Sequence, residues 1–404
     1  MLFTRYVVYP GENVKPLSLK VCIVGAGPAG LVVANALEQH GISYVILESR
    51  SQEYLRNRTR AGLIEPGVVR GLGELGVTDR LLSSAVFHEG FLLRLHDEEF
   101  RIEFAGVSGS PIYMYPQQRL VGDLIDLLPS SKIVFDVADV SIDRNESSGA
   151  TVSFEYADGH RRDVLCDFIV GADGARGISR EFLARKGIGS VSHDFGCDWL
   201  GILVDMPSPF AELVYAVSRR GFALHSMRGT SQSRIYLQVP RGSGASWTAN
   251  QIWDELNFRL GLERSYWESS MISQQMTVQL RSFQLDQMRH QRLFVLGDAA
   301  HIVPPSAAKG LNLAVDDALH LTRGLLSWYL HRNEGDLEVF EEQALRRAWA
   351  GQEFSSSMTS LLHYMPDEGA FSSTLRDVRW RTILSRPHSL KEFSDNYTGL
   401  ARHD

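Results

Sequence analysis

The segment VCIVGAGPAG, residues 21–30, joins a short β-branched run to a glycine-rich turn. Apolar residues then recur at helical spacing through residue 40, and a second apolar run, residues 44–47, ends at Glu48. This is the GxGxxG fingerprint of Gly25, Gly27 and Gly30 in its expected order of strand, helix, strand and acid. The glycines allow a pyrophosphate to approach a helix N-terminus, and the acid binds a ribose hydroxyl. The segment predicts a Rossmann-like dinucleotide-binding domain but does not distinguish FAD from NAD.

Two later apolar runs also end beside a glycine and an aspartate. One leads into Asp173-Gly174 and the other into Gly297-Asp298. Each pair alone is also typical of an ordinary turn. Behind a dinucleotide fold, however, two such strand ends can converge on one cofactor.

The segment after Gly297-Asp298 suits a planar ligand. Pro304 and Pro305 stiffen it, and the next three residues are small. A helix is expected to start near Lys309, and its free N–H groups favour a negatively charged ligand. An ordinary strand, loop and helix is the alternative, and the N-terminal fingerprint favours the ligand site.

Residues 199–240 change to alternating strand patterns, which predict one antiparallel sheet inserted before the return to the cofactor domain. Polar residues two positions apart share a strand face. Such a face is either solvated or a binding surface. The candidates on it are Tyr215, Ser226, Arg228, Arg234 and Tyr236.

Several other segments leave alternatives open. The alternating Arg56, Arg58 and Arg60 mark either a solvated face or a phosphate-binding segment. His88 is either a structural histidine or a catalytic one. Residues 63–82 have a helical pattern, and residues 311–331 and 337–364 predict amphipathic helices.

Composition narrows the class of protein. The chain has 404 residues, enough for two or three domains, and 41 Lys and Arg against 48 Asp and Glu give a net charge of -7. This charge gives no reason to expect nucleic acid or an anionic membrane as a partner. Three distant cysteines without a CxxC motif predict buried free thiols in a reducing, cytoplasmic compartment.

With these motifs in order, the chain resembles the class A flavoprotein aromatic hydroxylases, and within them the hydroxylases of hydroxybenzoates, over nearly its whole length after residues 1–19. In this family the GxGxxG motif binds the FAD pyrophosphate. The DG motif at Asp173 serves FAD and the nicotinamide cofactor, and the GD motif at Asp298 contacts the FAD ribityl chain. The ordered occurrence of all three is specific to the family.

The resemblance also implies roles for individual residues. Residues implied to bind the substrate are Ser226, Arg228, Arg234 and Tyr236. Residues implied to act in catalysis are Tyr215, Tyr397, His88 and, through its carbonyl, Pro305. Residues implied to contact FAD or the nicotinamide cofactor are Gly25, Gly27, Gly30, Glu48, Arg58, Arg60, Gln117, Asp173, Arg180, Arg281, Asp298, Lys309, Gly310, Leu311 and Asn312.

These implied roles are chemically consistent. A buried arginine is costly without an anion, so Arg228 predicts a benzoate-like carboxylate. Free phenols have a pKa near 10, so on the order of one in a thousand is ionised at neutral pH. A relay from Tyr215 through Tyr397 to His88 would raise that fraction and prepare the ring to attack an electrophilic flavin hydroperoxide.

Two departures from the family pattern bear on the cofactors. The family has glycine where Ala307 stands, so the backbone there is expected to give the flavin less freedom to move. Ser49 and Arg50 follow Glu48 in the segment that sets nicotinamide choice, which leaves NADPH and NADH both open.

The resulting hypothesis is an α/β fold, α+β overall. It divides into a leading arm (residues 1–19), an FAD-binding domain (20–189), a substrate-binding sheet domain (190–290) and a flavin loop with a C-terminal helical interface region (291–404). The expected cofactors are FAD and NADPH or NADH, with no metal, and a homodimer is implied by the resemblance.

The expected reaction is hydroxylation of 4-hydroxybenzoate to 3,4-dihydroxybenzoate with NAD(P)H and O2. Three alternatives stay open: a hydroxylase of a related substituted or amino benzoate, a flavin-binding protein that has lost catalysis, and a plain NAD-dependent dehydrogenase. The dehydrogenase would leave the DG and GD motifs without a role.

Overall fold

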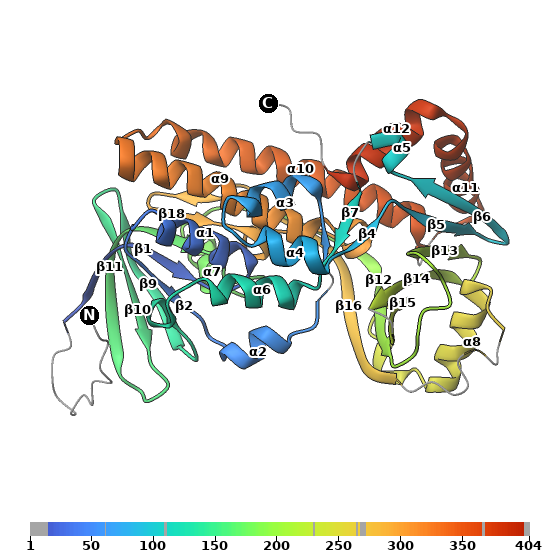
Figure 1. Cartoon of the computed structure of the whole chain (residues 1–404), viewed down its shortest axis with the longest axis horizontal. Coiled ribbons are helices and arrows are strands. Elements are labelled where there is room, and N and C mark those ends of the chain that lie inside the picture. The colour runs from blue at the N-terminus through green and yellow to red at the C-terminus, as the bar shows by residue number, and fades with distance from the viewer. Residues whose placement is uncertain are drawn as a thin grey trace.

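The structure is a computed structural model that describes residues 15–60, 62–108, 111–228, 231–263, 266, 272–365 and 368–399. It is a mixed α/β fold with two large sheets side by side, and two long helices run along both (Figure 1). Of the expected leading arm, residues 1–14 lie outside the described residues, and the first strand begins at Leu17.

The first sheet has the order β17-β18-β11-β1-β2-β8, and β10 and β9 extend from β11. The inner strands β18, β11, β1, β2 and β8 are parallel, as the Rossmann-like prediction requires. The strands are β1 (Leu17–Val24), β2 (Tyr44–Leu47), β8 (Ile133–Val134), β9 (Ala138–Glu146), β10 (Gly149–Glu155), β11 (Arg161–Gly171), β17 (Arg289–His290) and β18 (Leu293–Val295).

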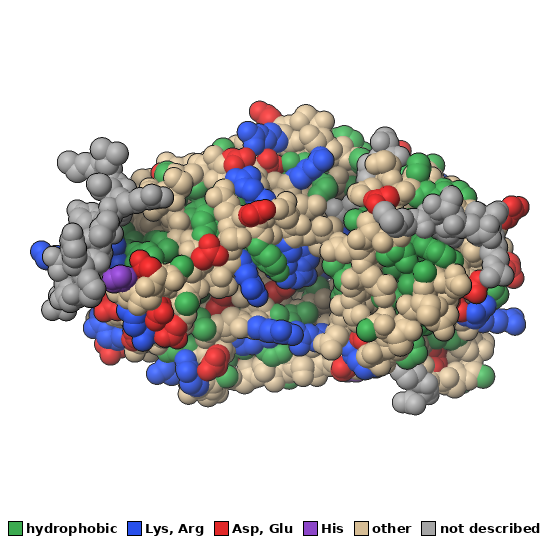
Figure 2. Space-filling model, turned by 90° about the horizontal axis from the view of Figure 1, so that it is seen from below, with side chains coloured by type: hydrophobic (Ala, Val, Ile, Leu, Met, Phe, Trp, Pro, Cys, Tyr) green, Lys and Arg blue, Asp and Glu red, His purple; other side chains and the backbone are tan. Residues whose placement is uncertain are grey.

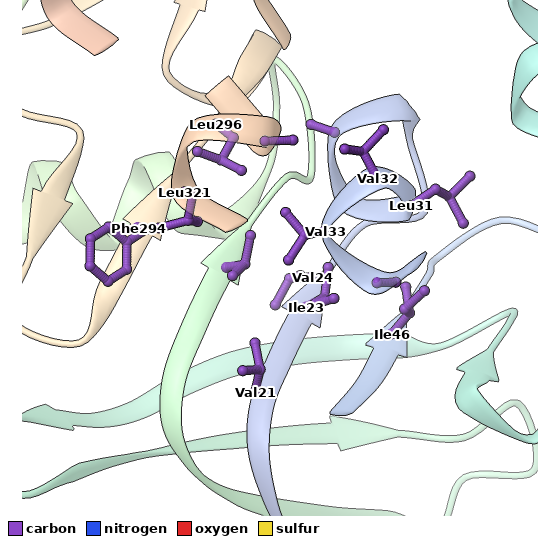
Figure 3. Packing of buried hydrophobic residues seen from close by; sticks show 14 of the residues in the cluster. Val21, Ile23, Val24, Leu31, Val32, Val33, Ile46, Phe294, Leu296 and Leu321 are labelled. Atoms are coloured by element: carbon purple, nitrogen blue, oxygen red, sulfur yellow. The ribbon is translucent and has the colours of Figure 1, made fainter. Parts of the chain in front are cut away.

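Helix α1 (Pro28–Gln39) starts directly behind the glycine-rich turn, because Pro28 is favoured at the first helical position. Figure 3 shows its apolar face, with Val33, packed over Ile23 of β1. Phe294 and Leu296, at the end of β18, pack in the same core beside Leu321 of the long helix α9 (Lys309–His331). This core holds the strand ends of the three motifs together.

The second sheet has the order β19-β16-β12-β15-β14-β13-β5-β6. One of its faces packs against α8 (Ala249–Leu260), and the other belongs to the core that contains Tyr215 and Tyr397. Its strands are β5 (Gly90–Leu95), β6 (Glu98–Glu103), β12 (Ser190–Val204), β13 (Val214–Ser218), β14 (Gly221–Arg228), β15 (Gln232–Pro240), β16 (Ile272–Leu285) and β19 (His301–Ile302).

Strands β5 and β6 come from the segment expected in the FAD-binding domain, yet they extend the second sheet. Leu93 pairs with Tyr215 in a parallel ladder between β5 and β13. No local pattern in residues 90–103 indicates which sheet they join, because pairing across such a sequence distance is set by tertiary packing.

The helical prediction for residues 63–82 was partly wrong. The segment holds a short strand and two helices, because Pro66 can only start a helix and Gly76 lies at φ +76°. A third, small sheet has the order β3-β7-β4. The elements in this region are β3 (Leu63–Ile64), α3 (Pro66–Gly73), α4 (Thr78–Ser84), β4 (Val86–His88) and β7 (Ile112–Met114).

Helix α10 connects the two sheets, and α9 packs against it (Figure 1). In α10, Leu337 and Phe340 belong to the first core, whereas Met358 and Leu362 belong to the second. The remaining helices are α2 (Gln52–Asn57), α5 (Ala105–Ser108), α6 (Gln117–Asp126), α7 (Ile178–Arg185), α10 (Gly335–Leu362), α11 (Ala370–Ser385) and α12 (Pro387–Thr398).

Candidate active site

The glycine-rich turn forms a cradle that side chains would fill. Gly25 has φ +103°, and a Cβ there would lie 2.3 Å from the carbonyl oxygen of Ala172. A Cβ at Gly30 would lie 2.1 Å from the carbonyl oxygen of Gly25. Gly27 caps the N-terminus of α1. The turn therefore leaves backbone N–H groups open to a pyrophosphate, and it brings the DG segment beside the fingerprint.

Glu48 lies at the end of β2, where it is 8% exposed. Its Oε2 accepts a hydrogen bond from the N–H of Ala26 at 2.7 Å, and its Oε1 accepts one from the N–H of Arg50 at 2.8 Å. A carboxylate has about four acceptor positions, so Glu48 can brace the turn and still accept a ribose hydroxyl.

The DG and GD motifs meet at the same place. Asp173 accepts a hydrogen bond from the N–H of Ser179 on Oδ2, while its Oδ1 is buried and unpaired within the described residues. Burial raises the pKa of Asp173. A Cβ on Gly297 would lie 3.8 Å from that of Ala29 on α1, and the neighbouring Asp298 is exposed. The ends of these strands therefore lie beside the N-terminal part of α1, and their binding of one cofactor stays a prediction.

Cationic side chains border this site. Arg60 follows α2 and has an exposed side chain. Its pKa is lowered, first by desolvation and then by Arg58, while Asp298, Tyr54 and Tyr236 act to raise it. Figure 2, seen from the side that carries α2, shows Lys and Arg side chains around a hollow in the middle of this face. Gln117 is half-buried at the start of α6.

Arg180 holds the GD turn through its backbone. It donates from Nε to the carbonyl of Ala299 at 3.0 Å and from Nη2 to that of Asp298 at 2.5 Å. Burial, with repulsion from Arg281, lowers its pKa to about 10. Arg180 therefore positions the GD turn, and Arg281 on β16 is close enough to repel Arg180. The contact of either arginine with a cofactor stays a prediction.

The two predicted tyrosines lie together on the core side of the second sheet. The hydroxyl groups of Tyr215 and Tyr397 are 2.8 Å apart, and that of Tyr215 also reaches the carbonyl of Ser306 at 3.3 Å. They are 2% and 0% exposed, among rings that include Phe91 and Phe104. Burial raises the pKa of both phenols, so both are neutral at neutral pH.

Strand register places the candidate substrate residues on one face of the second sheet, and their role in substrate binding stays a prediction. Ser226 lies opposite Arg234, and Tyr236 lies opposite Leu224, which in turn lies opposite Tyr215. Arg234 is 6% exposed, approaches the Tyr236 ring at 5.2 Å, and has an Nη1 without a partner in the described structure. A buried guanidinium with an open donor favours an anionic ligand. Arg228 ends β14, and its side chain lies outside the described part.

His88 lies on β4 and is buried, which lowers its pKa. The hydrogen bonds of the described residues include none between His88 and either tyrosine. Its role as the end of the relay therefore stays a prediction.

Several residues of the flavin loop and of the start of α9 are engaged in contacts within the protein. The carbonyl of Pro305 accepts the N–H of Ala308, and Ala308, not Ala307, has the positive φ of +53°. Asn312 binds the backbone of Leu63 and Glu65. Any contact of Lys309, Gly310 or Leu311 with an anionic cofactor would come from the N-terminus of α9, since the Lys309 side chain is engaged elsewhere.

Lys309 is fully buried. Its Nζ donates to Oε1 of Glu65 at 2.6 Å and to the carbonyl of Tyr397 at 3.0 Å. Through its bond to the carbonyl of Tyr397, the buried Lys309 fixes α12, and with it this tyrosine, against the start of α9.

Replacing Lys309 with Met is expected to reduce the free energy of unfolding by about 3–5 kcal/mol, because Glu65 would remain buried and unpaired. Denaturant unfolding monitored by circular dichroism measures it. The matched control is Lys391→Met, which breaks the exposed pair with Asp395 at 2.7 Å and should cost less than about 1 kcal/mol. Equal losses in the two variants would contradict the role of the buried pair.

The sequence did not indicate the wall of aromatic residues beside the tyrosines. Trp199 donates from Nε1 to Nε2 of His363 at 2.6 Å, and its ring lies 4.9 Å from that of Tyr236. His363 donates from Nδ1 to the carbonyl of Thr359 at 2.8 Å, and burial lowers its pKa to about 3. The strand alternation places Trp199 on this face, but no local pattern reveals a contact with a residue at the C-terminal end of α10.

Comparison with known proteins agrees with this site. A family model described as an FAD binding domain matches residues 18–355. The chain belongs to this family, and it is an FAD-dependent aromatic monooxygenase of class A. It is 35% identical to p-hydroxybenzoate hydroxylase of Acinetobacter baylyi, over 95% of this chain and 96% of that protein.

More distant proteins share the fold. The chain is 26% identical to 6-hydroxy-3-succinoylpyridine 3-monooxygenase of Pseudomonas putida, over 93% of this chain and 98% of that one. The crystal structure of p-nitrophenol 4-monooxygenase from Pseudomonas putida matches with a TM-score of 0.80 at 17% identity, covering 95% of this chain and all of that one. Among the described residues, no helix is long and apolar enough to cross a membrane.

Proposed function

We propose that this monooxygenase hydroxylates a 4-hydroxybenzoate-like acid next to its phenol hydroxyl, giving a 3,4-dihydroxybenzoate product. The Tyr215–Tyr397 pair carries the proposal, because two buried, hydrogen-bonded phenols suit the removal of a proton from a third. The relative that is named p-hydroxybenzoate hydroxylase supports the same substrate class. The net reaction consumes one O2, one NAD(P)H and one proton, and it releases NAD(P)+ and one water.

The carboxylate end of the substrate would be held on the sheet. Arg234 supplies a buried cation with an open Nη1, and Ser226 is 8% exposed beside it on β14. Arg228 and Tyr236 complete the proposed clamp. Holding the acid at this end would set the ring in one orientation, with its phenol toward the tyrosines.

The phenol end would lose its proton to the tyrosine pair. Because burial keeps both tyrosines neutral, Tyr215 can accept the substrate proton only as its own proton passes to Tyr397. We propose His88 as the group that releases this proton to solvent. The step makes the ring more nucleophilic without placing a lasting charge on the enzyme.

FAD, once bound, supplies the redox and oxygen-activating chemistry. The residues that fit it are the glycine cradle with Glu48, the unpaired carboxylate oxygen of Asp173 and the exposed Asp298. The N-terminus of α9 favours negative charge on the isoalloxazine ring. The arginines beside the GD turn are proposed to bind NADPH or NADH.

Oxidation of NADPH and NADH by the FAD-loaded protein, with and without 4-hydroxybenzoate, tests this function when the aromatic product is quantified in parallel. Stimulated oxidation with matching 3,4-dihydroxybenzoate is the expected result, and the faster nucleotide identifies the reductant. The same assay with 4-aminobenzoate tests the related-substrate alternative. Oxidation that no benzoate stimulates would favour a flavin protein without this catalysis.

A cytoplasmic homodimer is also proposed, on more limited grounds. Three buried free cysteines agree with a reducing compartment. Helix α11 exposes Phe371, Leu375 and Val378, spaced four and three residues apart, so that they form an apolar face of the kind that buries against a partner. Light scattering of the holoenzyme measures the oligomeric state, and a monomer at micromolar concentration would contradict it.

A further inference from the structure

A buried histidine and aspartate lie directly behind the GD turn. His301, on β19, and Asp317, on α9, are 1% and 0% exposed, and their Nε2 and Oδ2 atoms are 2.6 Å apart. Neither residue belongs to the proposed substrate clamp or proton relay.

The same carboxylate oxygen also holds the turn itself. The N–H of Gly297 donates to Oδ2 of Asp317 at 3.1 Å, while Oδ1 of Asp317 has no partner among the described residues. Gly297 has φ +57°, and a Cβ there would lie 2.9 Å from that of Ala314 on α9. Oδ2 of Asp317 therefore holds the GD turn against α9, and the contact with His301 fixes the orientation of this carboxylate.

The other contacts of the turn among the described residues involve its backbone, and the side chain of Asp298 is exposed. The N–H of Ala300 donates to the carbonyl of Gly297 at 2.8 Å, and Arg180 binds the carbonyls of Asp298 and Ala299. The backbone of the turn is held on both sides, and the side chain of Asp298 is exposed. The position of that carboxylate follows from the position of Gly297.

The charges around His301 support an ion pair. Burial lowers the pKa of His301, but the charges of Asp317 and then Asp298 outweigh burial, and the pKa is raised in spite of Arg347. A protonated His301 donates to Asp317 and neutralises it. Loss of either partner leaves an unpaired buried group next to the turn.

We propose that the His301–Asp317 pair is a positioning device for the cofactor, which fixes the GD turn so that Asp298 meets FAD. The inference rests on FAD binding alone and not on the identity of the substrate. Its test therefore needs neither a benzoate nor a nicotinamide, and it can fail or succeed independently of the proposed reaction.

The test is the Kd of the apoprotein for FAD, followed by flavin fluorescence, in the Asp317→Asn variant. Asparagine keeps the shape but loses the charge, and we expect FAD to bind at least tenfold more weakly. The matched control is Asp316→Asn, one residue away, which loses the ion pair with Arg347 at 2.7 Å but does not touch the turn. Its Kd should stay within about twofold of the parent value.

A rescue experiment separates positioning from simple stability. His301→Gln retains an N–H donor near the Nε2 position but carries no charge, so it should bind FAD more weakly than the parent and more tightly than His301→Leu, with the parent's visible flavin spectrum. His301→Leu has no donor and should match Asp317→Asn in both readouts. The proposal is overturned if Asp317→Asn lowers the Tm but leaves the Kd unchanged, if Asp316→Asn weakens FAD equally, or if the glutamine and leucine variants bind FAD alike.

Discussion

Replacing Tyr215 with Phe is expected to lower the rate of product formation by about 10²- to 10⁴-fold, the usual range for losing a positioned proton-transfer group. The substitution removes the hydroxyl that lies 2.8 Å from that of Tyr397 and 3.3 Å from the carbonyl of Ser306, but it keeps the buried ring. Steady-state assays with 4-hydroxybenzoate measure this rate of product formation. FAD affinity should not change, because neither phenol belongs to the glycine cradle.

Tyr329→Phe is the matched control for this loss. The hydroxyl of Tyr329 donates to the carbonyl of Lys20 at 3.0 Å and contacts Asp167 at 3.2 Å, within the FAD-binding half and outside the tyrosine pair. Its removal should leave product formation within about twofold of the parent rate, as expected for an exposed hydrogen bond. A Tyr215→Phe enzyme that hydroxylates as fast as this control would show that the proton leaves by another route.

The second large effect is expected at Gly25, where Gly25→Val should yield protein that retains less than about a tenth of the parent FAD. Valine is disfavoured at φ +103°, and its Cβ would stand 2.3 Å from the carbonyl oxygen of Ala172. The strain would therefore move the glycine-rich turn and the DG segment apart. Flavin absorbance per mole of purified protein measures the outcome.

Gly41→Val separates the cofactor effect from backbone strain. Gly41 also has a positive φ, +64°, but a Cβ there has nothing within 4 Å. This control should lose some stability and keep its flavin. If both variants lose flavin to the same extent, general destabilisation and not the cradle explains the loss.

The sequence predicted the fold around the three cofactor motifs because its signals are local. The pattern of a strand, a glycine turn and a helix is contained within a few neighbouring residues. The cradle at Gly25 and the start of α9 at Lys309 could therefore both be predicted. The shared face of Ser226, Arg234 and Tyr236 followed from the two-residue period of strands in the same way.

The parts that the sequence did not reveal depend on distant partners. Nothing near Lys309 indicates that its amine pairs with Glu65, and nothing near Trp199 indicates that it meets His363 just after α10. The side chain of Lys309, a residue implied to contact the cofactor, also binds the carbonyl of Tyr397 on α12. Side-chain direction at such positions is set by packing across the two cores and not by local propensity.

The separation of Tyr215 and Tyr397 by 182 positions also orders events during synthesis on the ribosome. At about 5–20 residues per second, roughly 10–40 s pass between the addition of the two tyrosines. All three FAD motifs precede Tyr397, so a nascent chain can acquire its flavin site before its second phenol exists. Under the proposed mechanism, the chain would therefore become competent for proton transfer only after the residues that hold the cofactor have been synthesised.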